Sequence, residues 1–170
     1  MKKDRKIKTY VFIGLFFLCL IDIIVFYKIH QVNGTSMAPT LNNGDSVIVK
    51  KHTHITRYEM IAFSIPKEKG MLVKRVIGMP GDAVIIQQNE LILNIGDRAA
   101  FNNTYRIHLE EYQAQQLQHI KRIPENQYFV LGDHIDVSKD SREFGFVQKK
   151  SIEGIVIDRI WPLNSFGRVN

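Results

Sequence analysis

The apolar and polar positions divide the chain into one long apolar stretch and many short ones. The long stretch, residues 9–29, reads TYVFIGLFFLCLIDIIVFYKI. It has the length of a helix that crosses a hydrocarbon core of roughly 30 Å. The later apolar runs are short and are bounded by Gly, Pro, Asp or Asn. The pattern therefore predicts a single N-terminal transmembrane helix followed by one domain, residues 30–170.

The short runs are rich in β-branched and aromatic residues, which is typical of strands. They occupy residues 46–50, 58–65, 71–77, 83–86, 90–95, 127–131 and 154–161. Residues 108–120 instead place Leu109, Tyr112, Leu117 and Ile120 at helical spacing, with glutamines 113, 115, 116 and 118 on a solvated face. Many short strands and one short helix predict a mainly β fold, an antiparallel, barrel-like β domain.

The charges before the long stretch predict its orientation. Five basic residues precede it against the single acid Asp4: Lys2, Lys3, Arg5, Lys6 and Lys8. The positive-inside rule then makes residues 1–8 a cytoplasmic basic tail, residues 9–29 the anchor in the cell membrane, and residues 30–170 an extracytoplasmic domain. A removable signal peptide is the alternative. Its basic start fits, but the apolar stretch is too long and no small-x-small cleavage site follows it.

Composition removes several classes of function. The net charge is +6, but after residue 30 the chain holds 17 Lys and Arg against 15 Asp and Glu, so nucleic acid is not an expected partner. The single cysteine, Cys19, lies in the apolar stretch, which excludes internal disulfides and Cys-ligated zinc. The histidines show no HExxH spacing, and Gly78–Gly81 lacks the Lys-Ser/Thr ending of a phosphate loop. Neither a metal site nor a cofactor is predicted.

Ser36 lies a few residues after the predicted anchor, in the segment Gly34–Leu41. A serine hydroxyl is a poor nucleophile until a base removes its proton. No pattern around the histidines indicates a Ser-His-Asp set, so a lysine is the candidate base. A turn in which the hydroxyl bonds nearby backbone is the alternative role for this serine.

Lys74 lies in the apolar run 71–77, where alternation sends Lys74 to one face of a strand and Arg75 to the other. One basic residue is therefore placed among apolar neighbours whichever face is buried. Burial disfavours the ammonium form and lowers a lysine pKa from about 10.4 toward the working pH, as a general base requires. An exposed lysine on a half-buried strand is the alternative.

A third polar segment, residues 132–145, completes a set of four sequence boxes. They are Ser36-Met-x-Pro-Thr-Leu41, Gly44-Asp45-x-Val-x-Val-x-Lys51, Lys74-Arg-Val-Ile-Gly-x-Pro-Gly-Asp82, and Gly132-Asp133 with Ser138-x-Asp140-Ser141-Arg142-x-x-Gly145. In this order the boxes resemble those of the type I signal peptidases, membrane-bound Ser-Lys proteases that cut signal peptides from exported preproteins. The resemblance runs from the apolar stretch almost to the C-terminus, and the short segment before the last box is similar to that of the compact, single-spanning Gram-positive forms.

The resemblance implies a role for individual residues. Ser36 is the expected nucleophile and Lys74 the expected general base, with the backbone N–H of Ser36 as an oxyanion donor. Ser138 is expected to hydrogen-bond the lysine and orient it. The residues expected to support the site are Asp133, Asp140 and Arg142, of which the last two are expected to pair.

The resemblance also implies the partners and where they bind. Secretory preproteins are the expected substrates, cut after Ala-x-Ala-like sites at the outer membrane face, with membrane lipid around the anchor. The peptide is expected to lie extended between residues 31–33 and 71–73. Val32, Met37 and Val73 are expected to line shallow pockets that reject large side chains by clash.

Two positions depart from the family pattern. His134 stands where Asn usually follows Gly132-Asp133, and Gly34 stands where some members carry a serine that donates to the oxyanion. A second oxyanion donor must therefore come from elsewhere.

Other functions were weighed against the signal peptidase. A catalytically silent, membrane-tethered paralogue that binds preproteins is the main alternative, although such a protein would be free to lose Ser36 or Lys74 and both are present. A repressor-type Ser-Lys protease would need no anchor, and an inert anchored β scaffold would leave the four boxes to chance.

Overall fold

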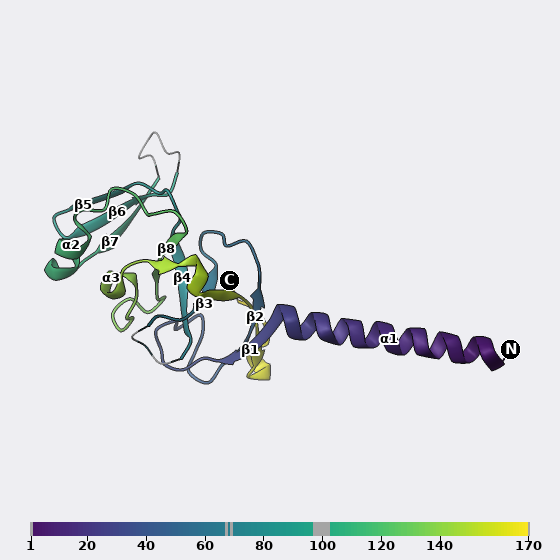
Figure 1. Cartoon of the computed structure of the whole chain (residues 1–170). Coiled ribbons are helices and arrows are strands. Elements are labelled where there is room, and N and C mark those ends of the chain that lie inside the picture. The colour runs from purple at the N-terminus through teal and green to yellow at the C-terminus, as the bar shows by residue number, and fades with distance from the viewer. Residues whose placement is uncertain (1, 67, 69, 97–102, 170) are drawn as a thin grey trace.

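The computed structural model of the chain describes residues 2–66, 68, 70–96 and 103–169. Figure 1 shows a long N-terminal helix that leads into a curled sheet, with a smaller sheet and a short helix farthest from the N-terminus. The helices are α1 (Lys2–Phe26), α2 (Glu111–Leu117) and α3 (Ser141–Phe144), with single 3-10 turns η1 (Lys149–Ser151) and η2 (Leu163–Ser165). The strands are β1 (Tyr27–Gln31), β2 (Ser46–Lys51), β3 (Met60–Phe63), β4 (Leu72–Gly78), β5 (Val84–Gln87), β6 (Glu90–Asn94), β7 (Thr104–His108), β8 (Gln127–Leu131), β9 (Val147–Gln148), β10 (Ile152–Trp161) and β11 (Gly167–Arg168).

The main sheet has the strand order β1-β2-β10-β3-β4-β8-β9, and β11 pairs with β10. Every strand pair in it is antiparallel, and β10 and β4 carry bulges that help the sheet to curl. The predicted mainly β, antiparallel fold is thereby confirmed. The sheet is an open half-barrel, with β1 and β9 as its outer strands.

Helix α1 ends at Phe26, before the predicted end of the apolar stretch at residue 29. Residues 27–31 instead form β1, which pairs with β2 from Tyr27↔Lys50 onward. Their backbone N–H and C=O groups form hydrogen bonds within the sheet instead of extending the helix. Within the described residues, no helix combines the length and the apolar content needed to cross a membrane. Of the predicted basic tail, Met1 lies outside the described residues and residues 2–8 belong to α1.

Each predicted strand region contains a strand, and four strands were not predicted: β1, β7, β9 and β11. The most consequential of these is β7, which pairs with β6 from Glu90↔His108 to Asn94↔Thr104. It completes a separate three-stranded sheet of order β5-β6-β7. This small sheet and α2 enclose an apolar cluster with Phe129 and Leu131 of β8, which ties them to the main sheet.

Helix α2 is shorter than the predicted 108–120, because His108 belongs to β7 and the helix starts only at Glu111. Two of the predicted facings are wrong. Tyr112 is 52% exposed, whereas Gln113, which was assigned to the solvated face, is buried. The side chain of Gln113 turns back and accepts a hydrogen bond from the Glu110 backbone N–H at 2.8 Å, so it caps the first turn instead of facing solvent.

β4 pairs with β3 on one side and β8 on the other, and both faces of the main sheet are covered by apolar clusters. Neighbouring residues of β3 belong to different apolar clusters. Ala62 packs in one with Val47, whereas Ile61 packs in the other with Val76. This alternation is the packing pattern of a strand that is buried on both sides. Side chains at the centre of β4 are therefore held in fixed directions.

Candidate active site

Lys74 occupies the middle of β4 and is buried, with 3% of its surface exposed. Its backbone position is set by pairing with Ile61 of β3. Arg75, the next residue, points to the other side, as the predicted alternation requires. The sequence prediction of a basic residue held among apolar neighbours is thus met by Lys74.

Ser36 lies in a run of turns between β1 and β2. The two ends of this run are joined by backbone hydrogen bonds from Val32 N–H to Asp45 C=O and from Gly44 N–H to Val32 C=O, both at 2.8 Å. At Gly34 the backbone has φ of +93°, a region that glycine adopts without steric cost. The turn brings the partly buried Ser36 over β4.

The Nζ atom of Lys74 lies 2.6 Å from the Oγ atom of Ser36, to which it donates a hydrogen bond. Burial lowers the pKa of Lys74 below its usual value, and the carboxylates of Asp140 and Asp133 oppose this only in part. A lysine with a lowered pKa is more readily neutral, and the neutral amine can accept a proton from a bonded hydroxyl. The arrangement suits a serine hydrolase whose base is a lysine.

Asp133 is paired with Arg75 rather than with the lysine. Arg75 Nε and Nη2 donate to the two carboxylate oxygens of Asp133 at 2.8 and 2.6 Å. Burial alone would raise the pKa of Asp133, but hydrogen bonds from Arg75 and Thr40 and the nearby positive charges hold it below its usual value. The pair ties β4, the strand that carries Lys74, to the loop after β8.

The predicted pair of Asp140 and Arg142 is present, with Arg142 Nε donating to Asp140 Oδ1 at 2.9 Å. Asp140 is fully buried and also accepts from the Gly132 N–H at 3.1 Å and the Arg142 N–H at 3.2 Å. Arg142 Nη2 donates in addition to the Ile135 carbonyl at 2.7 Å. Asp140 thereby caps α3 and fastens the loop 132–140 around the site.

Ser138 is near the dyad but does not make the predicted bond to the lysine. Its Oγ atom is buried and has no hydrogen-bond partner among the described residues. It lies against Gly132, where an added Cβ would come within 2.1 Å of Ser138 Oγ and 2.4 Å of the Ser36 carbonyl oxygen. Glycine at position 132 therefore leaves room for the Ser138 hydroxyl and the Ser36 carbonyl. The hydrogen bond that Lys74 Nζ makes in this structure is to Ser36 Oγ.

His134 contributes through its backbone. Its N–H donates to the Ser36 carbonyl oxygen at 3.1 Å, while its side chain is exposed. Any residue except proline supplies this N–H, which accounts physically for a histidine at a position where the family usually has Asn. At the other departure, Gly34, the backbone N–H donates to Asn43 Oδ1 at 2.8 Å.

A cavity of about 260 Å³ opens at the dyad. Its lining contains Ser36, Lys74 and Leu72, with Val137 and Phe144 among the apolar members. Val32, Met37 and Val73, the predicted pocket residues, are not in this lining. Val32 and Met37 are buried in one apolar cluster, and Val73 packs against that cluster. Their role in binding stays a prediction.

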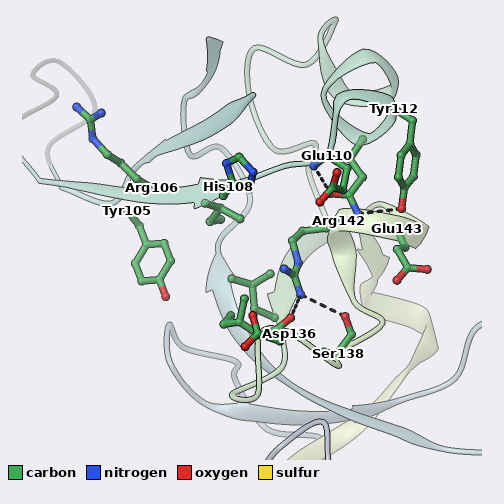
Figure 2. A pocket seen from close by; sticks show the side chains of 13 residues that line it. Tyr105, Arg106, His108, Glu110, Tyr112, Asp136, Ser138, Arg142 and Glu143 are labelled. Atoms are coloured by element: carbon green, nitrogen blue, oxygen red, sulfur yellow. Dashed lines mark hydrogen bonds between the residues drawn. The ribbon is translucent and has the colours of Figure 1, made fainter. Parts of the chain in front are cut away.

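A second, larger cavity of about 550 Å³ lies between the small sheet, α2 and the loop before α3. Figure 2 shows its polar lining, with Tyr105 and His108 from β7 on one side and Asp136, Ser138 and Arg142 on the other. Within this lining, the Arg142 guanidinium already donates hydrogen bonds to the Ile135 carbonyl and to Asp140, and it thereby holds the loop 132–140. Among the described residues, no group of three or more His, Cys, Asp or Glu side chains is placed to hold a metal ion.

Sequence reasoning missed the arginines that hold the aspartates of the other boxes. Asp82 is held by two bonds from Arg57 at 2.7 and 3.0 Å, and Asp45 by Arg159 at 3.0 Å. Both arginines lie far from their partners in the chain, so no local spacing could have identified them. Ser141 was quoted in a box without a role; its Oγ accepts from the Val130 N–H at 2.9 Å.

Comparison with known proteins identifies the family. The family model described as "Signal peptidase, peptidase S26" matches residues 5–161. Signal peptidase I V of Bacillus subtilis is 32% identical over 143 residues, covering 76% of this chain and 83% of that protein. Signal peptidase I of Bacillus caldolyticus is 35% identical over 149 residues, covering 81% of each. Signal peptidase IB of Staphylococcus aureus is 34% identical over 152 residues, covering 81% of this chain and 79% of that protein.

A crystal structure of a signal peptidase I from Enterococcus faecalis V583 is also similar, with 29% sequence identity, 61% of this chain and 97% of that one covered, and a TM-score of 0.42. The sequence matches place the chain among serine endopeptidases. It belongs to the signal peptidase family S26. The predicted function, that of a type I signal peptidase, is thereby confirmed.

Proposed function

We propose that the chain cleaves exported preproteins with Ser36 as nucleophile and Lys74 as general base. The observation that carries the proposal is the 2.6 Å contact between the Lys74 amine and the Ser36 hydroxyl, with the lysine buried. A buried amine is the form of lysine that spends time neutral near physiological pH. No side chain other than these two needs to change protonation state in the reaction.

In the first half of the reaction, neutral Lys74 takes the proton of Ser36 as the serine Oγ attacks the carbonyl carbon of the scissile bond. The developing oxyanion accepts a hydrogen bond from the Ser36 backbone N–H. The protonated lysine then gives its proton to the leaving amine, and the mature protein departs. The signal peptide remains bound to Ser36 as an ester.

In the second half, Lys74 removes a proton from a water molecule, and the resulting hydroxide attacks the ester carbonyl. As the bond to Ser36 Oγ breaks, Lys74 returns the proton to Oγ, and the signal peptide leaves with a free C-terminal carboxylate. The two ion pairs flanking the lysine, Asp133 with Arg75 and Asp140 with Arg142, are proposed to keep β4 and the loop 132–140 in register during both steps. Ser138 is proposed to assist only through its position beside Gly132.

The proposed specificity is for small side chains at the −1 and −3 positions, as in Ala-x-Ala. Val32, Met37 and Val73, which pack together beside Ser36, are proposed to line shallow pockets that reject larger groups by clash. The test is cleavage of a preprotein with an Ala-x-Ala site by the detergent-solubilised full chain, with the product mass identifying the cut. We expect cleavage after the −1 alanine and strong loss when that alanine is replaced by Phe. Cleavage elsewhere, or equal cleavage of the Phe substrate, contradicts the proposal.

We also propose that the N-terminal segment anchors the chain in the cell membrane, with its basic start on the cytoplasmic side. The side chains of α1 from residue 10 onward support this, because large apolar groups such as Phe12 and Ile24, each 73% exposed, have no protein cover. We expect the chain to remain in the membrane fraction after carbonate washing. We also expect protease added to the outside of intact, wall-free cells to digest its β domain. Release by carbonate contradicts anchoring.

A further inference from the structure

The small three-stranded sheet has a free edge at β7. Just beyond the end of this strand, and in the same register, the Leu109 N–H donates to the Asn89 carbonyl at 2.7 Å. In an antiparallel pair, positions that bond to the partner strand alternate with positions whose backbone groups point away from it. The odd-numbered residues of β7 therefore bond to β6, and the backbone N–H and C=O groups of Arg106 and His108 point outward.

These outward groups have no partner within the part of the chain that the structure describes, since no hydrogen bond reaches the backbone of Arg106 or His108 from that side. The opposite edge of the small sheet, at β5, is partly covered. There the Val84 N–H donates to the Lys121 carbonyl at 2.9 Å. The small sheet thus offers β7 as the edge to which a further strand can be added.

The cavity of about 550 Å³ runs along this free edge. Its lining includes four consecutive residues, 105–108. Successive side chains of a strand point to opposite faces of the sheet, and Figure 2 shows Tyr105 and Arg106 leaving β7 on opposite sides. A hollow that touches all four residues therefore lies at the edge of the sheet rather than over one face. Its volume falls in the range of ligand sites, about 300–1,000 Å³.

The other wall of this cavity carries negative charge that is not compensated. Asp136, from the loop 132–140, and Glu143, from α3, belong to the lining and are exposed. Neither forms an ion pair with a described residue. The two arginines of the lining already have carboxylate partners, because Arg142 is paired with Asp140, and Arg106 with a glutamate of β6.

We propose that this cavity is a docking site for an extended, basic segment of another protein, which adds to the small sheet as a strand beside β7. The partner's backbone bonds to the outward groups of Arg106 and His108, and its lysines or arginines pair with Asp136 and Glu143. The cavity shares no lining residue with the one at the dyad. The inference therefore goes beyond the proposed function and does not depend on it.

The free edge selects an extended partner. A strand that lies alongside β7 satisfies the outward N–H and C=O groups, as in other cases of strand addition. A helix cannot do so, because its backbone groups are bonded within the helix. The exposed carboxylates add little affinity, since such charges are screened by water and salt, but they set the preference for a basic partner.

The probe for this site is a peptide of alternating lysine and valine with blocked ends, about 5–6 residues long, the length of a typical strand. Fluorescence anisotropy measures its binding to the full chain in a non-ionic detergent at about pH 8, where histidine side chains are neutral. The same peptide with glutamate for lysine controls for charge. A version methylated at alternate backbone nitrogens controls for strand pairing. We expect only the unmodified lysine peptide to bind, and to bind more weakly as salt is added.

Two substitutions at one position separate the strand edge from its side chain. Arg106→Pro removes an N–H that points outward and leaves the bonds to β6 intact, a position at which a strand tolerates proline. We expect it to raise the Kd of the lysine peptide by about ten-fold. Arg106→Ala is the matched control, because it removes the same side chain and keeps the N–H; it should bind no more weakly than wild type. Asp136→Asn and Glu143→Gln should each raise the Kd about two- to five-fold.

Amide hydrogen exchange locates the bound peptide on the wild-type chain. Without peptide, the amides of Arg106 and His108 should exchange faster than those of Tyr105 and Ile107, which bond to β6. Saturating lysine peptide should slow exchange at Arg106 and His108. The proposal is overturned by any of four results: no binding of the lysine peptide, equal binding of the glutamate peptide, equal affinity in Arg106→Pro and Arg106→Ala, or binding without protection at these two amides. If circular dichroism shows that Arg106→Pro is unfolded, hydrogen exchange on wild type decides.

Discussion

Lys74 reaches from the centre of the main sheet to Ser36, and the amine nitrogen lies 2.6 Å from the serine hydroxyl oxygen. The two residues come from elements far apart in the sequence, a strand and a turn, and both are held by packing and backbone pairing. Backbone hydrogen bonds between Val32, Gly44 and Asp45 fix the turn, and pairing with β3 fixes the strand. The two side chains are therefore brought together by the positions of their backbones. The pH dependence of cleavage, a substitution at Gly132 and a substitution in the ion pair of Asp133 each test this arrangement.

The pH dependence of cleavage should show a rising limb that belongs to Lys74. Burial lowers its pKa, with Asp140 and Asp133 opposing the shift, and only the neutral amine can act as base. The value of kcat/KM should therefore increase with pH and level off below the ordinary lysine pKa of 10.5. A profile without this limb, or a limb centred at the ordinary value, speaks against lysine as the base.

Gly132→Ala should abolish cleavage while leaving most of the fold intact. The added Cβ would lie 2.1 Å from Ser138 Oγ and 2.4 Å from the Ser36 carbonyl, and the carbonyl is backbone that cannot simply turn away. We expect a loss of kcat of more than about 100-fold, since small displacements of reacting groups carry such costs, and a loss of stability of about 1–3 kcal/mol.

Gly14→Ala is the control for this variant, because a Cβ there meets nothing within 4 Å. It should cleave as wild type does. Activity in Gly132→Ala within a few-fold of wild type would mean that Ser36 is not held at the position described. Urea unfolding of both variants separates the loss of geometry from the loss of folding.

Asp133→Asn should destabilise the domain, and the effect should depend on pH. The folded-state pKa of Asp133 is lowered, although burial alone would raise it, because Arg75 and Thr40 donate hydrogen bonds to its carboxylate. Such a carboxylate stabilises the fold above its unfolded pKa, and this contribution is lost as pH falls through the lower folded pKa. At neutral pH we expect a loss of about 1–3 kcal/mol.

The difference in unfolding free energy between wild type and Asp133→Asn should shrink as the pH is lowered below the ordinary carboxyl range. Urea titrations at neutral and acid pH measure it directly. A difference that is constant across this range would show that the charge of Asp133 has no part in holding Arg75.

Ser138→Ala should not lower stability. The Ser138 hydroxyl is buried and has no partner among the described residues, so its removal breaks no hydrogen bond. We expect a gain of up to about 1 kcal/mol in urea unfolding, because an unsatisfied buried hydroxyl is removed. A loss of more than about 1 kcal/mol would indicate that the hydroxyl is hydrogen-bonded in solution.

Much of the fold could be predicted because its strands are local patterns. Residues 46–50 and 127–131 combine β-branched or aromatic residues with clear turn signals, and both are strands. The strand β7 was missed although Thr104–His108 alternates polar with apolar residues, which is the pattern of a half-buried strand. The span is only five residues long, and its pairing with β6 makes it a strand. The start of α2 was likewise set by a cap, Gln113 on Glu110, that periodicity does not reveal.

The candidate site was predictable where chemistry and strand alternation agreed. Strand alternation predicted that either Lys74 or Arg75 would lie among apolar neighbours, and the resemblance selected Lys74. Asp140 could be expected to pair with Arg142, two residues away. The ion pair between Arg75 and Asp133 could not be expected, because the two residues meet only in the folded chain. The need for glycine at position 132 could not be expected either, because it arises from the Ser138 hydroxyl and the Ser36 carbonyl, which approach Gly132 only in the folded chain.

The most direct test of the Ser-Lys mechanism is the cleavage rate of Lys74→Ala and Lys74→Arg beside wild type and Ser36→Ala, on one Ala-x-Ala preprotein. Circular dichroism would first establish that all four proteins are folded. The account predicts that only wild type cleaves, because alanine removes the base and the guanidinium of arginine stays charged. Cleavage by Lys74→Ala at a rate near that of wild type would contradict it.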